Sequence, residues 1–416
     1  MGLIRPEGVA YDPAAARYVL TVRYNPLLEP GLPSMAPSDM RPAHTPSSSP
    51  SPDSIERLAA DAMRSVFGKD PDARVAVSLS GGVDSTLVLG LLRRHFPDLD
   101  VTAISVRFGD GNDETGAAAR TAEHLGVRHV IVDVDDYTCD LPAAIHAASQ
   151  PMWDLHWYHV AKRAAAESAD ILVSGDGGDE LFGGYTFRYQ KFLAAVGGTT
   201  DSPDKRARAY IECHLRDHVP DQEAVFGPRM EFSWNDIWRV LRPHFDNGLE
   251  PLEQVFLADY NGKLLYNFAH VSRAMSRHFG IRTASPLLSN DMVRHAMGVR
   301  TDEKYDAARG VGKLPLRTLL GSMGLGHLIS GSKMGFSPDT VSYWRRYGYD
   351  VCDSYLGGAA ARTVSDGWIN RDWIRRNLSR DIRDVRYVNK LLGLLAFEVW
   401  YRIFVTCDMD PEAGLG

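Results

Sequence analysis

The sequence predicts an open α/β fold, a parallel sheet with flanking helices, followed by a mostly helical C-terminal part. Buried-strand and amphipathic-helix patterns alternate between residues 55 and 190 at the spacing of βαβ units. Two of the predicted strands run directly into glycine-rich turns, within residues 77–92 and 172–185. Ligands of such sheets bind at the carboxyl ends of the strands, so these two turns are the candidate site.

The individual elements follow from hydrophobic periodicity and from glycine and proline stops. Strands are expected at 73–80, 100–109, 127–136 and 170–174, and helices at 54–68, 85–97, 112–126, 141–149 and 158–169. Beyond residue 190, strand signals mostly disappear, and helical patterns rich in aromatic residues take over. The pattern therefore predicts one α/β core with helices added after it.

Composition shifts divide the chain into four predicted parts. Residues 1–29 form a short N-terminal extension, in which 16–28 alternate like a single strand, and residues 30–54 form a Pro/Ser-rich linker expected to be disordered. Residues 55–190 form the α/β core, and residues 191–416 form the helical part that completes the site.

Charge and cysteine content exclude several classes of protein. The formal net charge of −7 gives no basic footprint, so nucleic acid is not expected as a partner. The four cysteines lie far apart, without the spacing of a zinc site or a disulfide framework. No stretch is long and apolar enough to span a membrane, and the N-terminus lacks a secretory signal pattern, so we expect a cytoplasmic protein.

The first glycine-rich turn, SGGVDST, has the composition of a phosphate-binding loop. Gly81 and Gly82 allow the backbone to approach an anion, Ser80 and Ser85 add hydroxyl donors, and the following helix adds unpaired N–H groups. Asp84 would repel phosphate unless a divalent cation lies between them, which indicates a Mg²⁺ ligand. A plain glycine turn capped by serine and aspartate is the structural alternative.

The second turn, SGDGGDELFGGY, also places acidic residues beside glycines at a strand end. It contains Gly175, Asp176, Asp179 and Glu180. Two acidic turns at the ends of two strands of one sheet can converge on one metal–nucleotide complex, which favours this interpretation over a solvated acidic loop.

Together these two motifs resemble the synthetase domain of the asparagine synthetase B family. That family is a branch of the PP-loop ATP pyrophosphatases and is related to β-lactam synthetases and lasso-peptide cyclases. The resemblance extends over roughly residues 55–405, with further similar segments at 270–289, 312–320 and 331–344. It implies an ATP-using, AMP-forming ligase.

The resemblance also implies roles for individual residues. The ATP-binding residues would be Leu79, Ser80, Gly81, Gly82, Asp84, Ser85 and Gly175, with the backbone of Val106 at adenine. Asp84 and Asp179 would hold Mg²⁺. Asp176 would act on the incoming amine, and Lys333 would neutralise charge on the α-phosphate and pyrophosphate; a turn-forming aspartate and an ordinary surface lysine are the alternatives.

The chain departs from the family pattern in two places. Gly2 follows Met1 where glutamine-hydrolysing members have cysteine, so ammonia would come from solution, from a separate glutaminase subunit, or be replaced by a substrate amine. The segment GIRTASPLLS lacks the family glutamate and has Ser289 in place of the final aspartate, which puts aspartate as substrate in doubt. We expect Arg282 to lie near the acceptor pocket and bind a different carboxylate.

The aromatic segment PMWDLHWYHV, residues 151–160, is interpreted as core, with an acceptor-pocket lining as the alternative.

The sequence thus predicts an amide ligase that uses ATP and Mg²⁺ to join a small-molecule carboxylate to ammonia or an amine, in specialised metabolism. A carrier-bound substrate and a homodimer are compatible with it. Ammonia-dependent asparagine synthesis is the alternative within the family. A PP-loop enzyme that modifies RNA and a non-catalytic nucleotide-binding scaffold are the alternatives outside it; the acidic balance argues against the first, and the retained Asp84, Asp179 and Lys333 argue against the second.

Overall fold

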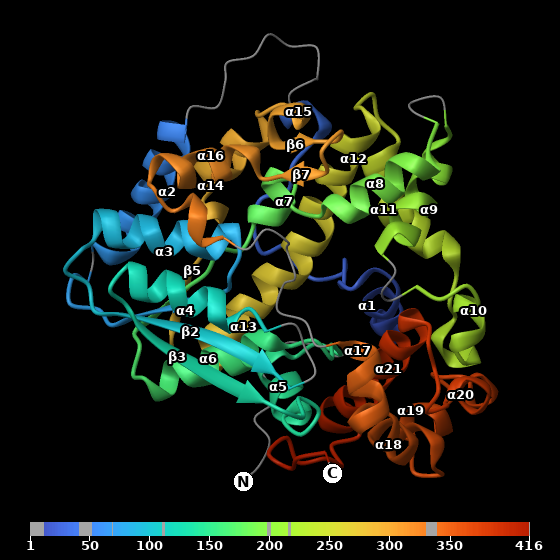
Figure 1. Cartoon of the computed structure of the whole chain (residues 1–416). Helices are drawn as coiled ribbons and strands as arrows, with labels where there is room; N and C mark the ends of the chain where they lie inside the picture. Colours follow the sequence, from blue (N-terminus) through green and yellow to red (C-terminus); the bar gives the residue numbers. More distant parts are fainter. Residues whose placement is uncertain are drawn as a thin grey trace.

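A five-stranded parallel sheet organises the molecule. The computed structural model describes residues 12–40, 52–68, 70–109, 113–197, 201–214, 218–329 and 339–415. The sheet has the order β3-β2-β1-β4-β5. Figure 1 labels β2, β3 and β5 of this sheet. Its strands are β1 Val75–Ser78, β2 Val101–Phe108, β3 Arg128–Val134, β4 Ile171–Val173 and β5 Arg282–Ala284. The predicted open α/β fold is confirmed, and a separate two-stranded antiparallel pair consists of β6 Tyr305–Asp306 and β7 Val311–Gly312.

Helices make up most of the remaining described chain. The α-helices between residues 16 and 195 are α1 Ala16–Val22, α2 Pro52–Phe67, α3 Val83–His95, α4 Thr115–His124, α5 Leu141–Ala148, α6 His156–Ala166, α7 Gly178–Phe182 and α8 Thr186–Ala195. The later α-helices are α9 Pro203–His214, α10 Gln222–Val225, α11 Trp234–Phe245, α12 Pro251–Asp259, α13 Ala269–Phe279, α14 Asn290–Met297, α15 Thr301–Lys304, α16 Leu314–Ser322, α17 Thr340–Tyr343, α18 Tyr349–Cys352, α19 Arg362–Ser365, α20 Arg371–Asn377 and α21 Val385–Phe404. A π-helical segment, η4 Tyr260–Phe268, joins α12 to α13.

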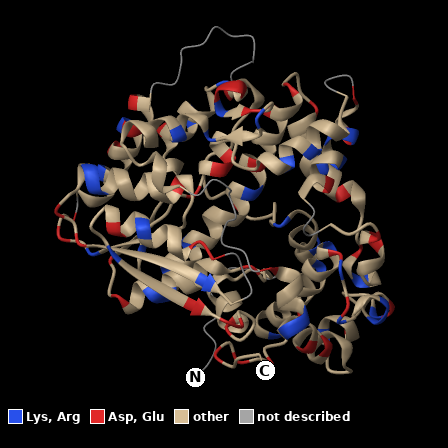
Figure 2. Cartoon of the chain, in the orientation of Figure 1, with Lys and Arg blue, Asp and Glu red and all other residues tan. Residues whose placement is uncertain are grey.

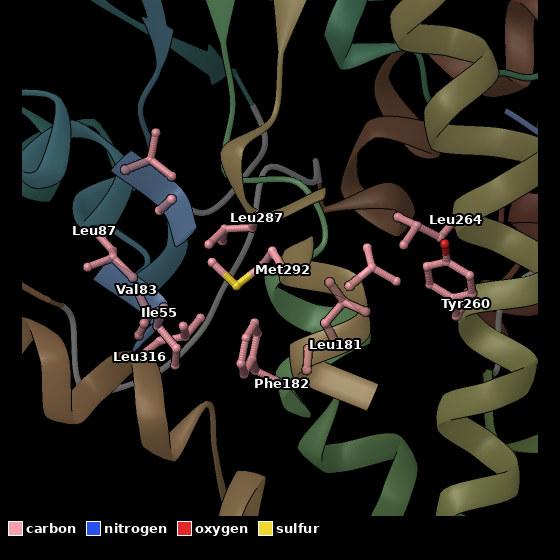
Figure 3. Packing of buried hydrophobic residues seen from close by; sticks show 14 of the residues in the cluster. Ile55, Val83, Leu87, Leu181, Phe182, Tyr260, Leu264, Leu287, Met292 and Leu316 are labelled. Carbon is pink, nitrogen blue, oxygen red and sulfur yellow. The ribbon is translucent and has the colours of Figure 1, made fainter. Parts of the chain in front are cut away.

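The central strand is apolar on both faces because helices cover each side of the sheet. Val75 and Val77 of β1 belong to one core cluster, whereas Ala76 between them belongs to a second. Figure 3 shows part of the first cluster, where Leu87 of α3 lies near Leu316 of α16. A strand covered on both faces reads as a continuous apolar run, which is why the predicted strands were found.

The N-terminal segment corrects one sequence prediction. Residues 16–28 were expected to form a strand, but α1 is a helix whose C-cap residue, Arg23, has φ +69°. Ala16, Val19 and Leu20 are buried in the second core cluster. Their spacing is helical, so the alternation in the sequence was incidental to the packing.

Two findings bear on the predicted domain boundaries. Part of the predicted 30–54 linker is ordered against η4: Gly31 N donates to Leu265 O at 3.1 Å, and the Asn261 side chain bonds both the N–H and the C=O of Met35 at 2.9 and 2.7 Å. Residues 41–51 lie outside the described part, and residues 52–54 begin α2. The fifth strand, β5, comes from beyond the predicted 55–190 core.

The distribution of charged residues and the character of the helices bear on the expected partners and location of the protein. Basic and acidic residues are interspersed over the fold in the view of Figure 2. No helix in the described ranges combines the length and the apolar character needed to cross a bilayer. The cytoplasmic location stays a prediction.

Candidate active site

The two glycine-rich turns lie side by side at one edge of the sheet. β1 pairs in parallel with β4, with Val77 opposite Val173, so the turns that follow these strands leave the same edge. Both turns line a pocket of about 390 Å³, together with residues of α6 and the start of α16. Predicted site residues that line this pocket are Ser80, Gly82, Asp84, Ser85, Gly175, Asp176 and Asp179.

Hydroxyl groups fix the first turn. The Ser80 N–H donates to Ser85 Oγ at 3.0 Å, and Ser80 Oγ accepts from Gly82 N at 3.1 Å. Gly81 has a packing role, because a Cβ there would lie 2.6 Å from the Cβ of Ala117 near the start of α4. The turn is thus preorganised by its own side chains and by close contact with a neighbouring helix.

The second turn makes room for the aspartate of the first. A Cβ added at Gly178 would lie 2.3 Å from Cγ of Asp84, and one at Gly175 would lie 2.9 Å from its Cβ. A Cβ at Gly184 would lie 1.7 Å from Oδ1 of Asp179. Glycine is therefore required at these positions by the carboxylates that occupy the space.

Lys313 joins the two carboxylates, and sequence reasoning did not assign it a role. Its Nζ forms an ion pair with Asp84 and lies 2.8 Å from Oδ1 of Asp179. Its backbone N donates to Phe182 O at 2.8 Å just before α16 begins, which fixes the lysine over the turn. Burial alone would lower the pKa of Lys313, but the charges of Asp179 and Asp84 outweigh burial and raise it. The signal was present in the segment GKLPLRTLL.

The donor set at this point fits a magnesium ion. Asp84 and Asp179 are hard oxygen donors that already converge on one cation, the Lys313 ammonium. Mg²⁺ in nucleotide sites takes one or two protein carboxylates and completes its coordination with substrate phosphates and water. Two converging carboxylates beside a glycine-rich pocket match that requirement.

Asp176 lies in the same pocket with a perturbed acidity. Its Oδ2 accepts a hydrogen bond from Ser174 Oγ at 3.0 Å, and Ser174 Oγ also lies 2.8 Å from Ser285 Oγ. Desolvation raises the pKa of Asp176 to about 7; the Ser174 bond opposes the rise, and the charges of Glu180 and Asp84 add to it. A carboxylate with this pKa exchanges protons near neutral pH, as a general base must.

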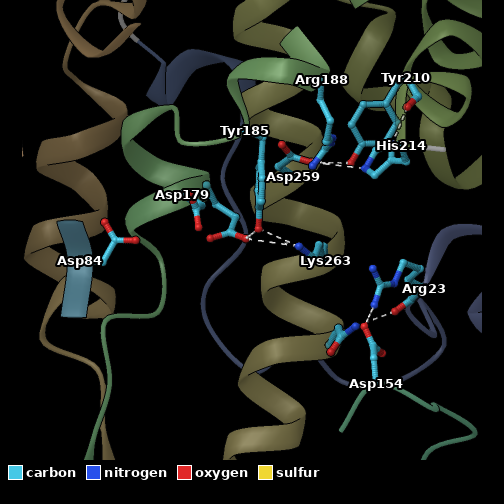
Figure 4. A network of polar contacts seen from close by, with 12 residues as sticks. Arg23, Asp84, Asp154, Asp179, Tyr185, Arg188, Tyr210, His214, Asp259 and Lys263 are labelled. Carbon is cyan, nitrogen blue, oxygen red and sulfur yellow. Dashed lines mark hydrogen bonds and ion pairs between the residues drawn. The ribbon is translucent and has the colours of Figure 1, made fainter. Parts of the chain in front are cut away.

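A buried polar group borders the pocket on the side of η4. Lys263 Nζ donates to the hydroxyl of Tyr185 at 2.7 Å (Figure 4). It also lies 3.7 Å from Oε1 of Glu180, to which the Tyr185 hydroxyl donates. Burial lowers the pKa of Lys263 and raises that of Glu180. Sequence reasoning noted Glu180 but missed Lys263, which lies more than eighty residues further along the chain.

The predicted residues Leu79, Val106 and Lys333 either do not line the pocket or lie outside the described chain. Leu79 is fully buried and its carbonyl accepts from Ser105 Oγ at 2.7 Å, and Val106 is buried in the second core cluster, so neither side chain lines the pocket. The contact of the Val106 backbone with adenine stays a prediction. Lys333 lies outside the described residues.

Arg282 lies away from the candidate site. It begins β5 opposite Ile171, the first residue of β4, so it lies at the edge of the sheet away from the turns. Its side chain is exposed and donates to Asp70 Oδ2 at 2.7 Å. The prediction that Arg282 lies near the acceptor pocket was wrong, because the strand begins rather than ends at that residue.

The sequence as a whole matches a known family. The family model described as asparagine synthase covers residues 56–402. The chain belongs to the asparagine synthase family. This membership agrees with the resemblance found from the two turns.

Individual relatives match the chain over most of its length. A Mycobacterium tuberculosis protein assigned as a glutamine-hydrolysing asparagine synthetase is 25% identical over 82% of this chain and 56% of its own length. Asparagine synthetase [glutamine-hydrolyzing] 1 of Bacillus subtilis is 22% identical over 82% of this chain and 58% of its own. The chain thus spans little more than half the length of these relatives.

Among solved structures, U34-tRNA thiolase NcsA from Methanococcus maripaludis aligns over 82% of this chain and 80% of its own, with 15% identity and a TM-score of 0.31. NMN synthetase from Francisella tularensis aligns over 32% of this chain and 58% of its own, with 19% identity and a TM-score of 0.26.

Proposed function

We propose that the protein is an AMP-forming amide ligase, which adenylates a substrate carboxylate and transfers the acyl group to ammonia or an amine. The observation that carries the proposal is the meeting of Asp84 and Asp179 at one Lys313 ammonium, with Asp176 in the same pocket. Family membership supports the use of ATP.

The first step is adenylation. An oxygen of the substrate carboxylate attacks the α-phosphorus of ATP; a bond between that oxygen and phosphorus forms, the bond from phosphorus to the bridging oxygen breaks, and pyrophosphate leaves. Asp84 and Asp179 would hold Mg²⁺, which supplies positive charge to the departing pyrophosphate. The Lys313 ammonium adds fixed positive charge beside the two carboxylates, and Lys333 is proposed to do the same at the α-phosphate.

The second step is aminolysis. The amine nitrogen attacks the acyl carbon, the C–N bond forms, and the C–O bond to AMP breaks. The amine loses a proton in this step, and the ionised form of Asp176 accepts it. The hydrogen bond from Ser174 fixes the orientation of that carboxylate. Much of the rate enhancement would come from holding the two reactants together.

The test combines product analysis with matched variants. Reactions that contain ATP, Mg²⁺, ammonium and a panel of carboxylic acids are analysed by mass spectrometry for AMP and the amide product. Asp84→Asn and Lys333→Ala should each abolish pyrophosphate release. Asp98→Asn, an exposed carboxylate on the same α/β unit, is the control and should retain full activity. ADP in place of AMP, or full activity of Asp84→Asn, would contradict the proposal.

Ammonia-dependent asparagine synthesis is the second candidate, favoured by the relatives named above. The same panel separates the two, because only the second predicts L-aspartate as the preferred acid. A role in specialised metabolism follows if another acid is preferred.

A further inference from the structure

A second cavity adjoins the candidate nucleotide pocket. It has a volume of about 120 Å³ and shares the side chains of His156, Trp157 and Phe268 with that pocket. Because the same three residues border both spaces, a molecule bound in the cavity would end beside the nucleotide pocket.

Aromatic rings line much of the cavity. Rings that border it belong to Phe108, Tyr137, Trp153, Trp157, His159 and Phe268. The segment 151–160 supplies several of these; Trp153 and Trp157 are each 5% exposed, so the interpretation of this segment as core is confirmed, and it also lines the cavity. Planar faces of this kind favour an apolar or aromatic occupant.

One cation stands where the two spaces meet. Lys263 lines the cavity, while its partners Tyr185 and Glu180 line the nucleotide pocket. Its Nζ lies 4.5 Å from the ring centres of both Tyr185 and Phe268. Figure 4 shows Lys263 between Tyr185 and the ion pair of Arg23 with Asp154, and this pair also borders the cavity. A carboxylate placed at this junction would meet the Lys263 ammonium, which it would share with Glu180.

Size and charge restrict what fits. A cavity of about 150 Å³ in another protein holds one benzene molecule, so a cavity of about 120 Å³ has room for at most one six-membered ring or an aliphatic group of similar size, and not for a fused bicycle. A second carboxylate on the ligand would be buried among aromatic rings and near Asp154, which is costly.

We infer that this cavity is the acceptor site for a monocarboxylic acid with a single ring or an equally small apolar body, whose carboxylate lies at the Lys263 edge. The inference rests on the ligase function proposed above and names its substrate class. It predicts that aspartate is a poor substrate.

The test measures binding and turnover separately. Phenylacetate, cyclohexylacetate, 1-naphthylacetate, succinate and L-aspartate are compared by carboxylate-dependent ATP–pyrophosphate exchange, and by ligand-observed NMR in the presence of a non-hydrolysable ATP analogue. The single-ring acids should bind and give at least tenfold more exchange than the bicyclic acid or the two dicarboxylates. If aspartate or succinate supported exchange and the other acids did not, the inference would be overturned and the proposed ligase function would stand. Absence of binding by both single-ring acids would also overturn it, with or without turnover.

Two variants alter the cavity in opposite directions. Ala144→Leu places a larger side chain in the cavity and reduces its volume. This variant should lose binding of phenylacetate and retain binding of ATP. Met152→Ala enlarges it and should gain binding of 1-naphthylacetate. Met63→Ala removes a methionine of similar burial from the other core cluster and is the control for general loosening. Gain of naphthylacetate binding in Met63→Ala, or unchanged selectivity in both cavity variants, would show that the cavity is a packing space.

Discussion

Replacing Lys313 with methionine keeps the length of the side chain and removes its charge. The ammonium lies 2.8 Å from Asp179 Oδ1 and also pairs with Asp84, and the Lys313 side chain is 6% exposed. At an effective dielectric of about 20, a pair at this distance attracts by about 6 kcal/mol, before the cost of desolvating the charges. Removing one partner of a buried ion pair typically destabilises by about 3–5 kcal/mol, because the remaining charges are left uncompensated.

The pH dependence follows from the raised pKa of Lys313. A lysine whose folded pKa lies above its unfolded value contributes stability that is fully present below the unfolded pKa and is lost as the pH rises through the folded pKa. The wild-type contribution should therefore be constant between pH 6 and pH 9. In Lys313→Met, the two facing carboxylates repel each other, so stability should increase as the pH falls and they take up a proton.

The assay is urea denaturation at pH 6 and pH 8, with and without MgCl₂. We expect Lys313→Met to lose about 3–5 kcal/mol of apparent unfolding free energy at pH 8, less at pH 6, and to recover part of the loss on addition of Mg²⁺. Lys191→Met replaces an exposed lysine and is the control. A Lys313→Met protein within about 0.5 kcal/mol of wild type at pH 8, with no response to Mg²⁺, would refute the electrostatic reasoning.

Three further changes test the site. Gly178→Ala places a Cβ 2.3 Å from Cγ of Asp84, so pyrophosphate release should fall at least a hundredfold. Gly248→Ala is the control, because its added Cβ has open space around it and pyrophosphate release should not change. Equal rates in the two variants would show that Asp84 has no required position. Amide formation should rise with pH through about 7 as Asp176 ionises, and a pH–rate profile unchanged in Asp176→Asn would remove it as the base. Arg282→Ala should leave the KM for the acid unchanged within about twofold, since Arg282 lies at the opposite edge of the sheet; a large rise in KM would restore its predicted role.

The sheet was predictable where burial leaves a long apolar signal. The run that became β1 is covered by helices on both faces, so its residues are apolar throughout. β5 has three residues, too few for a periodic pattern, and it joins the sheet through pairing with β4 far away in sequence. The helix α1 was mistaken for a strand because seven residues satisfy either period, and tertiary packing, such as its contact with α21, decides between them.

The site was predictable to the extent that its residues lie in the two turns. Asp84, Asp176 and Asp179 were found because glycines at a strand end suggest a ligand. Lys263 comes from a segment without such a turn, and Lys313 follows a glycine in GKLPLRTLL that was not connected with the site; the importance of both depends on which carboxylates they meet after folding. Lys313 and Lys263 meet their carboxylate partners only in the folded chain, so local sequence patterns do not reveal these contacts.

The glycines of the second turn change how the two motifs should be interpreted. A glycine in a nucleotide-binding turn is usually assigned to the phosphate, but Gly175 and Gly178 stand where a side chain would collide with Asp84 of the other turn. The aspartate of the first motif therefore sets the glycine spacing of the second. If so, replacing Asp84 with glycine should relieve the clash of Gly178→Ala, and the double variant should be more stable than the sum of the two single changes predicts, measured by urea denaturation in a double-mutant cycle. Strict additivity would mean that the two turns are independent, and that Gly178 serves the ligand rather than its neighbour.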